Sequence, residues 1–167
     1  EGAIMSQPIL RPFEPKDTEA VVEIANLAWG RIYASQHDIF GDELYDVLCP
    51  EGPQRKGNEM RGHCERTPNR IRICEVDGRV AGFISWSMDE EKQIGTLGNN
   101  GLHPDFTGQG LGTFMYRSAL EHFRTHGMHH AKVHTGLDKG HDPARRAYER
   151  VGFDIRHESI NYYMKLV

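Results

Sequence analysis

A short glycine-rich segment, Gly108-Gln-Gly-Leu-Gly-Thr113, has the composition that points most directly to chemistry. It lies between a segment with strand character and one with helix character. Glycines let the backbone turn sharply, and they let amide groups approach a ligand without side chains in the way. The first amides of a helix have no partners within it, and the helix dipole places partial positive charge there. The segment therefore predicts a site for a phosphate or pyrophosphate.

Two common phosphate-binding patterns do not fit this loop. A nucleoside-triphosphate loop needs Gly-Lys-Ser/Thr, whereas Gly112 is followed directly by Thr113 with no lysine between them. A dinucleotide fold places its glycines in the first strand-helix unit, with an acidic residue about twenty positions further on. Here the loop lies two-thirds of the way along the chain and follows a predicted antiparallel meander.

The segment Ile94 to Phe153 resembles the GNAT acetyltransferases. Members of that family carry Arg/Gln-x-x-Gly-x-Gly/Ala after a strand that ends in an apolar-x-Pro step, and here Leu102-His-Pro104 is followed by Thr107-Gly-Gln-Gly-Leu-Gly112. A second motif, Asp142-Pro-Ala-Arg-Arg-Ala-Tyr-Glu-Arg-Val-Gly-Phe153, is similar to the family's helix that ends in Tyr-x-x-x-Gly-Phe. Thr107 departs from the pattern, so we expect backbone amides to make most contacts to the pyrophosphate.

The resemblance implies that acetyl-CoA is the co-substrate. It implies one GNAT-like α/β domain, with a mixed central sheet of about six to seven strands flanked by helices. Acetyl-CoA would lie in a splay between two central parallel strands, one ending at Leu102 and one running from Ala131 to Thr135. The residues that the resemblance assigns to acetyl-CoA binding are Leu102, Gly108, Gln109, Gly110, Leu111, Gly112, Thr113 and Asp142.

The reaction implied by the resemblance is transfer of an acetyl group to an amine. A neutral primary amine would attack the thioester directly, so that positioning carries much of the rate. A backbone amide near Leu102 would polarise the thioester carbonyl. The expected acceptor is a small-molecule or peptide amine. The alternative is a non-catalytic module that binds acyl-CoA for sensing, and the absence of a carboxylate between Gln93 and Gly101 keeps this alternative open.

Tyr148 is the candidate catalytic residue, because it is the tyrosine of the second motif. The resemblance implies that it protonates the leaving thiolate. A second interpretation is a core aromatic residue with an incidental hydroxyl, because Tyr148 shares an apolar stripe with Ala144 and Val151. If Tyr148 is the acid, removing its hydroxyl group lowers turnover; if it is only a core residue, turnover is unchanged.

The residue that accepts the proton of the amine is less well marked. Asn99 and Asn100 could orient the substrate or a water, and strand alternation would point them to opposite sides. They could equally belong to a polar bulge bonded to local backbone. His134, on the neighbouring strand, is a further candidate base, or else a packed or exposed strand residue.

The numbers of histidine and cysteine residues suggest two other kinds of site to consider, a metal site and a thiol nucleophile. The histidines near residues 126–134 would form a metal site only if three side chains converged, and we predict no metal. Cys49, Cys64 and Cys74 are odd in number and lack paired spacing. They are interpreted as reduced thiols in a cytoplasmic protein, and nothing local marks one of them as a nucleophile.

The overall composition is that of an ordinary globular protein of one domain. Hydrophobic residues make up 38% of the 167 residues, charged residues 26%, and the net charge is −4. We therefore expect neither a nucleic acid nor a membrane as partner, no membrane span and no secretory signal, while a homodimer is compatible with the sequence. Residues 5–167 are assigned to the domain. Glu1 to Ile4 precede the first methionine and are interpreted as a remnant of recombinant expression.

The elements that must position these residues follow from hydrophobic periodicity. Apolar residues at helical spacing predict helices near residues 18–29, 111–123 and 143–151. Residues 30–69 are irregular and are interpreted as a helix with a mobile loop. Alternation predicts strands at 9–11, 71–75, 80–88, 93–102, 131–135 and 155–166. Glycines within 93–102 suggest a bulge or the close approach of another molecule.

Overall fold

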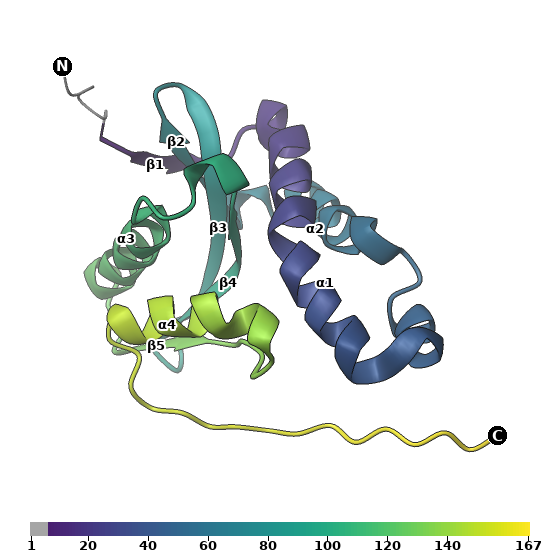
Figure 1. Cartoon of the computed structure of the whole chain (residues 1–167). Helices are drawn as coiled ribbons and strands as arrows, with labels where there is room; N and C mark the ends of the chain where they lie inside the picture. Colours follow the sequence, from purple (N-terminus) through teal and green to yellow (C-terminus); the bar gives the residue numbers. More distant parts are fainter. Residues whose placement is uncertain (1–6) are drawn as a thin grey trace.

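The computed structural model describes residues 7–167 and places helices on both faces of one mixed sheet (Figure 1). The interpretation of Glu1 to Ile4 lies outside these residues. In chain order the elements are β1 (Ile9–Pro12), α1 (Thr18–Leu48), α2 (Arg55–Arg66), β2 (Ile71–Val76), β3 (Arg79–Asp89), β4 (Ile94–Leu102), α3 (Leu111–Thr125), β5 (His130–Val133) and α4 (Asp142–Arg150).

The five strands of the sheet follow the chain in the order β1-β2-β3-β4-β5. The first four are antiparallel neighbours, and β4 and β5 are parallel. Asp77 and Gly78 join β2 to β3 with φ of 51° and 75°, which suits the right-handed twist of a hairpin. The α/β fold class and the antiparallel meander are as predicted. The number of strands is smaller than the predicted six to seven, and β5 lies at the edge rather than at the centre of the sheet.

The two parallel strands separate part-way along their length. β5 pairs with β4 only from Ile94 to Leu97, opposite His130 to Val133. The remainder of β4, Gly98 to Leu102, continues beyond the end of β5 and keeps its pairing with β3. This is the splay that the sequence predicts, and it opens toward the glycine loop.

Apolar side chains close both faces of the sheet. The face under α1 and α2 is filled by Val21, Ile24, Ala25, Met60, Cys64, Ile71, Ile73 and Phe83. The face under α3 and α4 is filled by a larger cluster that includes Ile84, Trp86, Leu97, Met115, Phe123 and Tyr148. Burial of each large side chain contributes about 1.5–3 kcal/mol. These two clusters hold the helices that carry the candidate site.

The helix predicted within residues 30–69 is present as the second half of α1, but the part predicted as a mobile loop contains a second helix, α2. α1 runs to Leu48, with a break in helical geometry at Gly41, where φ is 69°. Its second half extends past the sheet, and after Tyr33 its apolar residues are no longer spaced for burial. Hydrophobic periodicity therefore gives only a weak signal for this half of the helix. Despite this length, no helix within residues 7–167 has the apolar composition needed to cross a bilayer.

Gly95 in β4 gives a test of the packing between the sheet and α3. A methyl group at Gly95 would overlap the ring of Phe123, which is 2% exposed. We expect Gly95→Ala to lower the free energy of unfolding by about 1–3 kcal/mol. Gly30→Ala is the matched control: it adds the same methyl group in open space within α1 and is expected to raise stability by about 0.5–1 kcal/mol. Chemical denaturation of both variants measures the difference; equal effects would contradict the expected packing.

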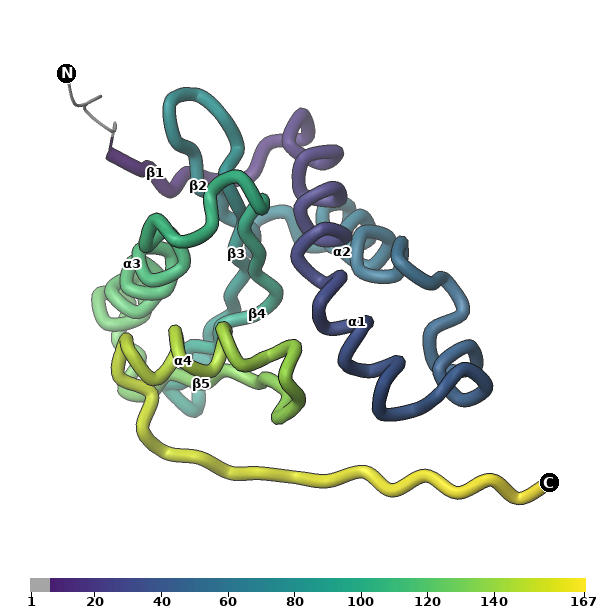
Figure 2. The backbone as a smooth tube through the Cα atoms, viewed as in Figure 1, coloured from purple at the N-terminus to yellow at the C-terminus, as the bar shows by residue number. Residues whose placement is uncertain are grey.

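The C-terminal residues do not form the strand predicted at 155–166. Residues 154–167, here called the C-terminal arm, are extended and exposed, and they run clear of β5 (Figure 2). Near its end the arm touches α1, where the rings of Phe40 and Tyr163 lie 5.3 Å apart and Lys165 pairs with Glu43 at 2.8 Å. Alternation of side chains favours a strand, but a strand forms only where its backbone groups find partners.

Candidate active site

The glycine loop connects β4 to α3 at the open end of the splay. The chain leaves Leu102, passes through a single turn anchored by the buried Phe106, and reaches two glycines in the left-handed region. Gly108 has φ of 76° and Gly110 has φ of 78°. The amide of Phe114 donates to the carbonyl of Gly110 at 3.0 Å, which is the first bond of this helix. The three preceding helical amides have no partner within the helix and remain available to an anion.

Side chains in the loop are engaged locally and leave the backbone exposed. The hydroxyl of Thr107 donates to the carbonyl of Pro104 at 2.9 Å, and the amide of Gln109 donates to the carbonyl of Asp105 at 3.3 Å. The first turn of α3 contains no acidic residue. These bonds support the expectation that a pyrophosphate would be held mainly by backbone amides, with Thr107 serving to fix the loop.

A β-bulge in β4 controls where the polar side chains of this strand point. Ile84 lies opposite Asn100 and Trp86 lies opposite Leu97, so Ser85 faces two residues, Gly98 and Asn99. The hydroxyl of Ser85 donates to the carbonyl of Asn99 at 3.1 Å. The bulge predicted from the glycines is therefore present. Because it adds one residue, Leu97 and Asn100 share a face although they are three positions apart.

Asn100 points to the side of α3 and α4, where it joins two tyrosines. Its amide nitrogen donates to the hydroxyl of Tyr148 at 3.2 Å, and its carbonyl accepts from the hydroxyl of Tyr116 at 2.7 Å. The two tyrosine rings lie 4.9 Å apart. Tyr148 is only 6% exposed, yet in its bond to Asn100 the phenolic oxygen is the acceptor. Its hydrogen can therefore still be donated. Tyr148 is therefore a buried residue of the core whose hydroxyl group lies beside β4, and its role as the acid stays a prediction.

Asn99 points to the opposite side, toward α2. Its amide nitrogen donates to a carboxylate oxygen of Glu59 at 3.1 Å. The prediction that the two asparagines face opposite sides of the strand is thus confirmed. The alternative of a polar bulge bonded to local backbone is also met in part, because Asn100 donates to the carbonyl of Gly98 at 3.1 Å.

Glu59 contacts Asn99 in the structure but is not among the residues predicted from the sequence. It lies 40 positions before Asn99, within the segment that lacks clear periodicity. The only signal was the presence of acidic residues in that segment, and nothing in their spacing distinguishes Glu59. The pairing depends on the packing of α2 against α1 and of α1 against β4, which is a tertiary feature.

The surroundings of Glu59 keep its carboxylate ionised. Partial burial acts to raise the pKa of Glu59, but the hydrogen bonds and charge of Lys56 and the hydrogen bond from Asn99 outweigh it, so the pKa lies below its ordinary value. Lys56 is bonded to both carboxylate oxygens, at 3.0 and 2.9 Å, and its ammonium group lies 4.6 Å from the ring of Trp29. A fixed carboxylate therefore stands beside β4.

The remaining predicted residues occupy different surroundings. His134 is exposed and lies one residue beyond the end of β5. Asp142 begins α4, and its carboxylate pairs with Arg145, which also donates to the carbonyls of Gly136 and Asp138 at 2.6 and 3.0 Å. These contacts give Asp142 and Arg145 a structural role at the start of α4. They do not join either residue to the glycine loop.

The described residues contain no group of three or more histidine, cysteine or acidic side chains that could hold a metal ion. All three cysteines are buried and free, and burial raises the pKa of Cys64 and of Cys74 to about 11. Thiolate chemistry is therefore disfavoured at these two. A surface hollow of about 760 Å³, lined in part by Phe13, Cys64 and Arg72, includes none of the candidate site residues.

The architecture defines the class of protein. A mixed sheet opens between two parallel strands, and a glycine loop heads the helix next to the opening, an arrangement suited to a ligand with a pyrophosphate group. Residues 23–153 match the profile of the Acetyltransferase (GNAT) family, which is more than half of the chain. The chain belongs to the GNAT acetyltransferase family.

Individual relatives agree with this assignment. An uncharacterized N-acetyltransferase of Methanocaldococcus jannaschii is 29% identical over 101 residues, which are 57% of this chain and 43% of that protein. A mycothiol acetyltransferase of Corynebacterium glutamicum is 31% identical over 86 residues, 52% of this chain and 29% of that protein. The matches thus span less than half the length of these curated relatives. The crystal structure of a PaiA N-acetyltransferase from Thermoplasma acidophilum in complex with coenzyme A superimposes with a TM-score of 0.66 at 17% identity and covers 92% of this chain and 94% of that one.

Proposed function

We propose that this protein is an acetyl-CoA-dependent N-acetyltransferase that moves an acetyl group to a primary amine of a small molecule or peptide. The observation that carries the proposal is the pair of contacts on adjacent residues of β4. Asn100 binds the phenol of Tyr148 on one side of the strand, and Asn99 binds the carboxylate of Glu59 on the other. The strand beside the splay therefore has a proton donor on one face and a proton acceptor on the other.

Acetyl-CoA fits the arrangement of the loop and the splay. Its pyrophosphate would be held by the backbone from Gly108 to Thr113, at the positive end of α3. The pantetheine arm would extend along β4 beyond Leu97, where β5 no longer pairs with it. The amide near Leu102 would donate to the thioester carbonyl and stabilise the oxyanion that develops there.

The chemical steps can then be assigned to residues of this chain. The amine nitrogen attacks the thioester carbon, the new C–N bond forms, and the C–S bond breaks. Before the attack, Glu59 takes the proton of the ammonium form, either directly or through a water next to Asn99, and releases it to solvent. The departing thiolate receives the phenolic hydrogen of Tyr148, and the proton that the acylated nitrogen then loses restores the phenol through solvent. The net products are an N-acetylated amine and free coenzyme A.

An assay that separates binding from transfer tests the proposal. Binding of acetyl-CoA is measured by calorimetry, and release of the coenzyme A thiol is measured across a panel of small and peptide amines. Transfer predicts release of thiol that depends on the added amine and is matched by acetylated product. Binding without amine-dependent release would favour the sensing module instead. Absence of binding would remove both functions.

The loop supplies a matched pair of substitutions for the binding step. Gly110 and Gly127 stand at opposite ends of α3, both have φ of 78°, and neither has a neighbouring atom within 4 Å of an added methyl group. Alanine should strain the backbone equally at both positions, at a cost of about 1 kcal/mol. We expect Gly110→Ala to raise the dissociation constant of acetyl-CoA about 10-fold, and Gly127→Ala to leave it nearly unchanged. Equal affinities in the two variants would place the pyrophosphate elsewhere.

A further inference from the structure

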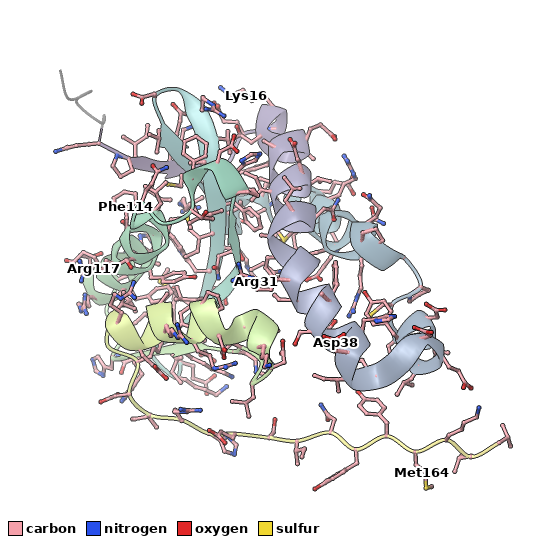
Figure 3. All side chains as sticks on the ribbon, viewed as in Figure 1. Lys16, Arg31, Asp38, Phe114, Arg117 and Met164 are labelled. Atoms are coloured by element: carbon pink, nitrogen blue, oxygen red, sulfur yellow. The ribbon has the colours of Figure 1, made fainter. Side chains whose placement is uncertain are left out.

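A second surface hollow lies between α3 and the strands β1, β2 and β3. Its volume is about 500 Å³, which is within the range of small-molecule sites. It is called the Trp86 hollow here, and the residues that line it include Ile9, Arg72, Trp86, Phe114, Ser118 and His122. Phe114 lies in the first turn of α3, on the side near β1 (Figure 3). None of the side chains that line this hollow takes part in the proposed transfer reaction.

Arg72 brings to the hollow a positive charge that no carboxylate among the described residues neutralises. The residue is partly buried, and burial lowers the pKa of Arg72, but an arginine stays protonated at neutral pH. The other arginines of intermediate exposure within residues 7–167 each pair with a carboxylate, and they are Arg11, Arg61 and Arg145. A partly buried charge without a partner costs free energy, and an anionic ligand would recover that cost.

The guanidinium of Arg72 is held in one orientation that leaves two of its nitrogens free. Its Nη1 donates to the carbonyls of Asn69 and Ile71 at 2.8 and 3.1 Å. Its central carbon lies 4.9 Å from the centre of the Trp86 ring. Within the part of the chain that the structure describes, Nε and Nη2 donate to no acceptor. These two nitrogens form the fork that a carboxylate accepts from with both oxygens.

The charge of the hollow suits an anion with a single negative charge. Among residues 7–167, none of those that line it is acidic. The ring of His122 lies 5.1 Å from the ring of Trp86 and 4.0 Å from the ring of His126. Burial above all, with the neighbouring His126 and Arg72, lowers the pKa of His122, so its imidazole is neutral at neutral pH and can donate one hydrogen bond. One positive charge matches a carboxylate better than a phosphate group, which carries nearly two negative charges.

Apolar surface surrounds the free side of the guanidinium. Ile9 of β1, which is 50% exposed, lines one wall of the hollow, and Phe114 of α3 lines another. A ligand that covers such side chains gains about 25 cal/mol for each Å² of apolar surface removed from water. The hollow therefore combines one oriented cation with apolar walls.

From these observations we propose that the Trp86 hollow is a binding site for a small monocarboxylate with an apolar body. The carboxylate pairs with Nε and Nη2 of Arg72, and the apolar body lies against Ile9 and Phe114. His122 supplies a neutral hydrogen-bond donor beside the charged pair. This site is separate from the glycine loop and from the residues proposed to act on the amine and the thioester.

The fluorescence of Trp86 provides a direct test. The chain contains two tryptophans, so Trp29→Phe leaves Trp86 as the reporter. Benzoate is titrated into this variant at constant ionic strength, with benzamide as the neutral probe of similar shape and acetate as the carboxylate without an apolar body. We expect benzoate to change the emission saturably and to bind about 10-fold or more tightly than either of the others. No saturable change, or equal affinity for benzoate and either comparison probe, would overturn the proposal.

Arg72→Gln and Arg79→Gln, made in the same background, form a matched pair. The Arg72 guanidinium lies 4.9 Å from the centre of the Trp86 ring. The Arg79 guanidinium lies at the same distance from the Phe106 ring, but it pairs with Asp105 and does not line the hollow. We expect Arg72→Gln to weaken benzoate binding about 10-fold and Arg79→Gln to leave it nearly unchanged. Benzoate affinity that survives in Arg72→Gln would refute the site.

A second pair of variants keeps the test decisive if Arg72→Gln does not fold. Ser118 lines the hollow from α3. Ser118→Asp places a carboxylate in the hollow, where it competes for Arg72 and repels an anion, whereas Ser118→Asn adds a side chain of the same size without charge. We expect Ser118→Asp to bind benzoate about 10-fold more weakly than Ser118→Asn does. Equal affinities in these two variants would contradict the proposed pairing with Arg72.

Discussion

Replacing Glu59 with glutamine is expected to lower kcat/KM for the amine about 100-fold at neutral pH, the scale of a lost general base. The substitution keeps an oxygen that can accept from Asn99, but it removes the charge and the capacity to take a proton. Reaction then depends on amine that is already neutral. The activity of the variant should therefore rise with pH by about 10-fold per unit, until the pKa of the amine is reached.

The pH profile separates this role from a structural one. The activity of the wild-type protein should depend less steeply on pH above the pKa of Glu59, because the Glu59 carboxylate is already ionised at neutral pH. Glu65→Gln is the control, since Glu65 lies on α2 but lines the hollow beside Phe13 rather than β4. An unchanged kcat/KM in Glu59→Gln, or the same loss in Glu65→Gln, would remove Glu59 from the reaction.

Replacing Tyr148 with phenylalanine is expected to lower kcat about 100-fold while the affinity for acetyl-CoA stays within about 2-fold. The ring remains in the cluster under α3 and α4, so the fold is retained. Loss of the bond from Asn100 should reduce the free energy of unfolding by about 1 kcal/mol. Turnover at saturating substrates and calorimetric binding of acetyl-CoA measure the two effects separately.

Tyr116→Phe provides the comparison for Tyr148. It removes the other hydroxyl group that binds Asn100, from a side chain that is equally buried. Burial and the neighbouring Tyr148 raise the pKa of Tyr116, which disfavours ionisation of this phenol. A similar small loss of turnover in both variants would indicate that the tyrosines only position Asn100. Unchanged turnover in Tyr148→Phe would exclude it as the acid.

The parts of the fold that the sequence predicted are those with local signals. The hairpin at Asp77-Gly78, the glycine loop and the apolar face of α3 each depend on residues close together in the chain. The bulge was also predictable, because three glycines in one strand are unusual. Its effect on Asn99 and Asn100 follows from alternation once the position of the extra residue is known.

The parts that the sequence did not predict depend on long-range contacts. Glu59 reaches Asn99 only because α2 packs against α1, which in turn packs against β4. The second half of α1 lacks the burial that produces helical periodicity. The strand predicted at 155–166 has the correct alternation, but among the described residues this segment pairs with no other strand. Periodicity shows that a segment can form a strand, and it does not show whether a neighbouring strand pairs with it.

The bulge in β4 has a consequence for how new activities could arise on this scaffold. Asn99 and Asn100 are consecutive, so their Cα atoms are about 3.8 Å apart. Asn99 donates a hydrogen bond to Glu59, which comes from the first half of the chain, and Asn100 donates one to Tyr148, which comes from the second half. In the proposed mechanism, the residue that takes the proton of the acceptor amine and the residue that protonates the departing thiolate thus come from separate stretches of sequence that meet at a single peptide unit. If that mechanism holds, substitutions in α1 and α2 would change the surroundings of Glu59 without touching the glycine loop.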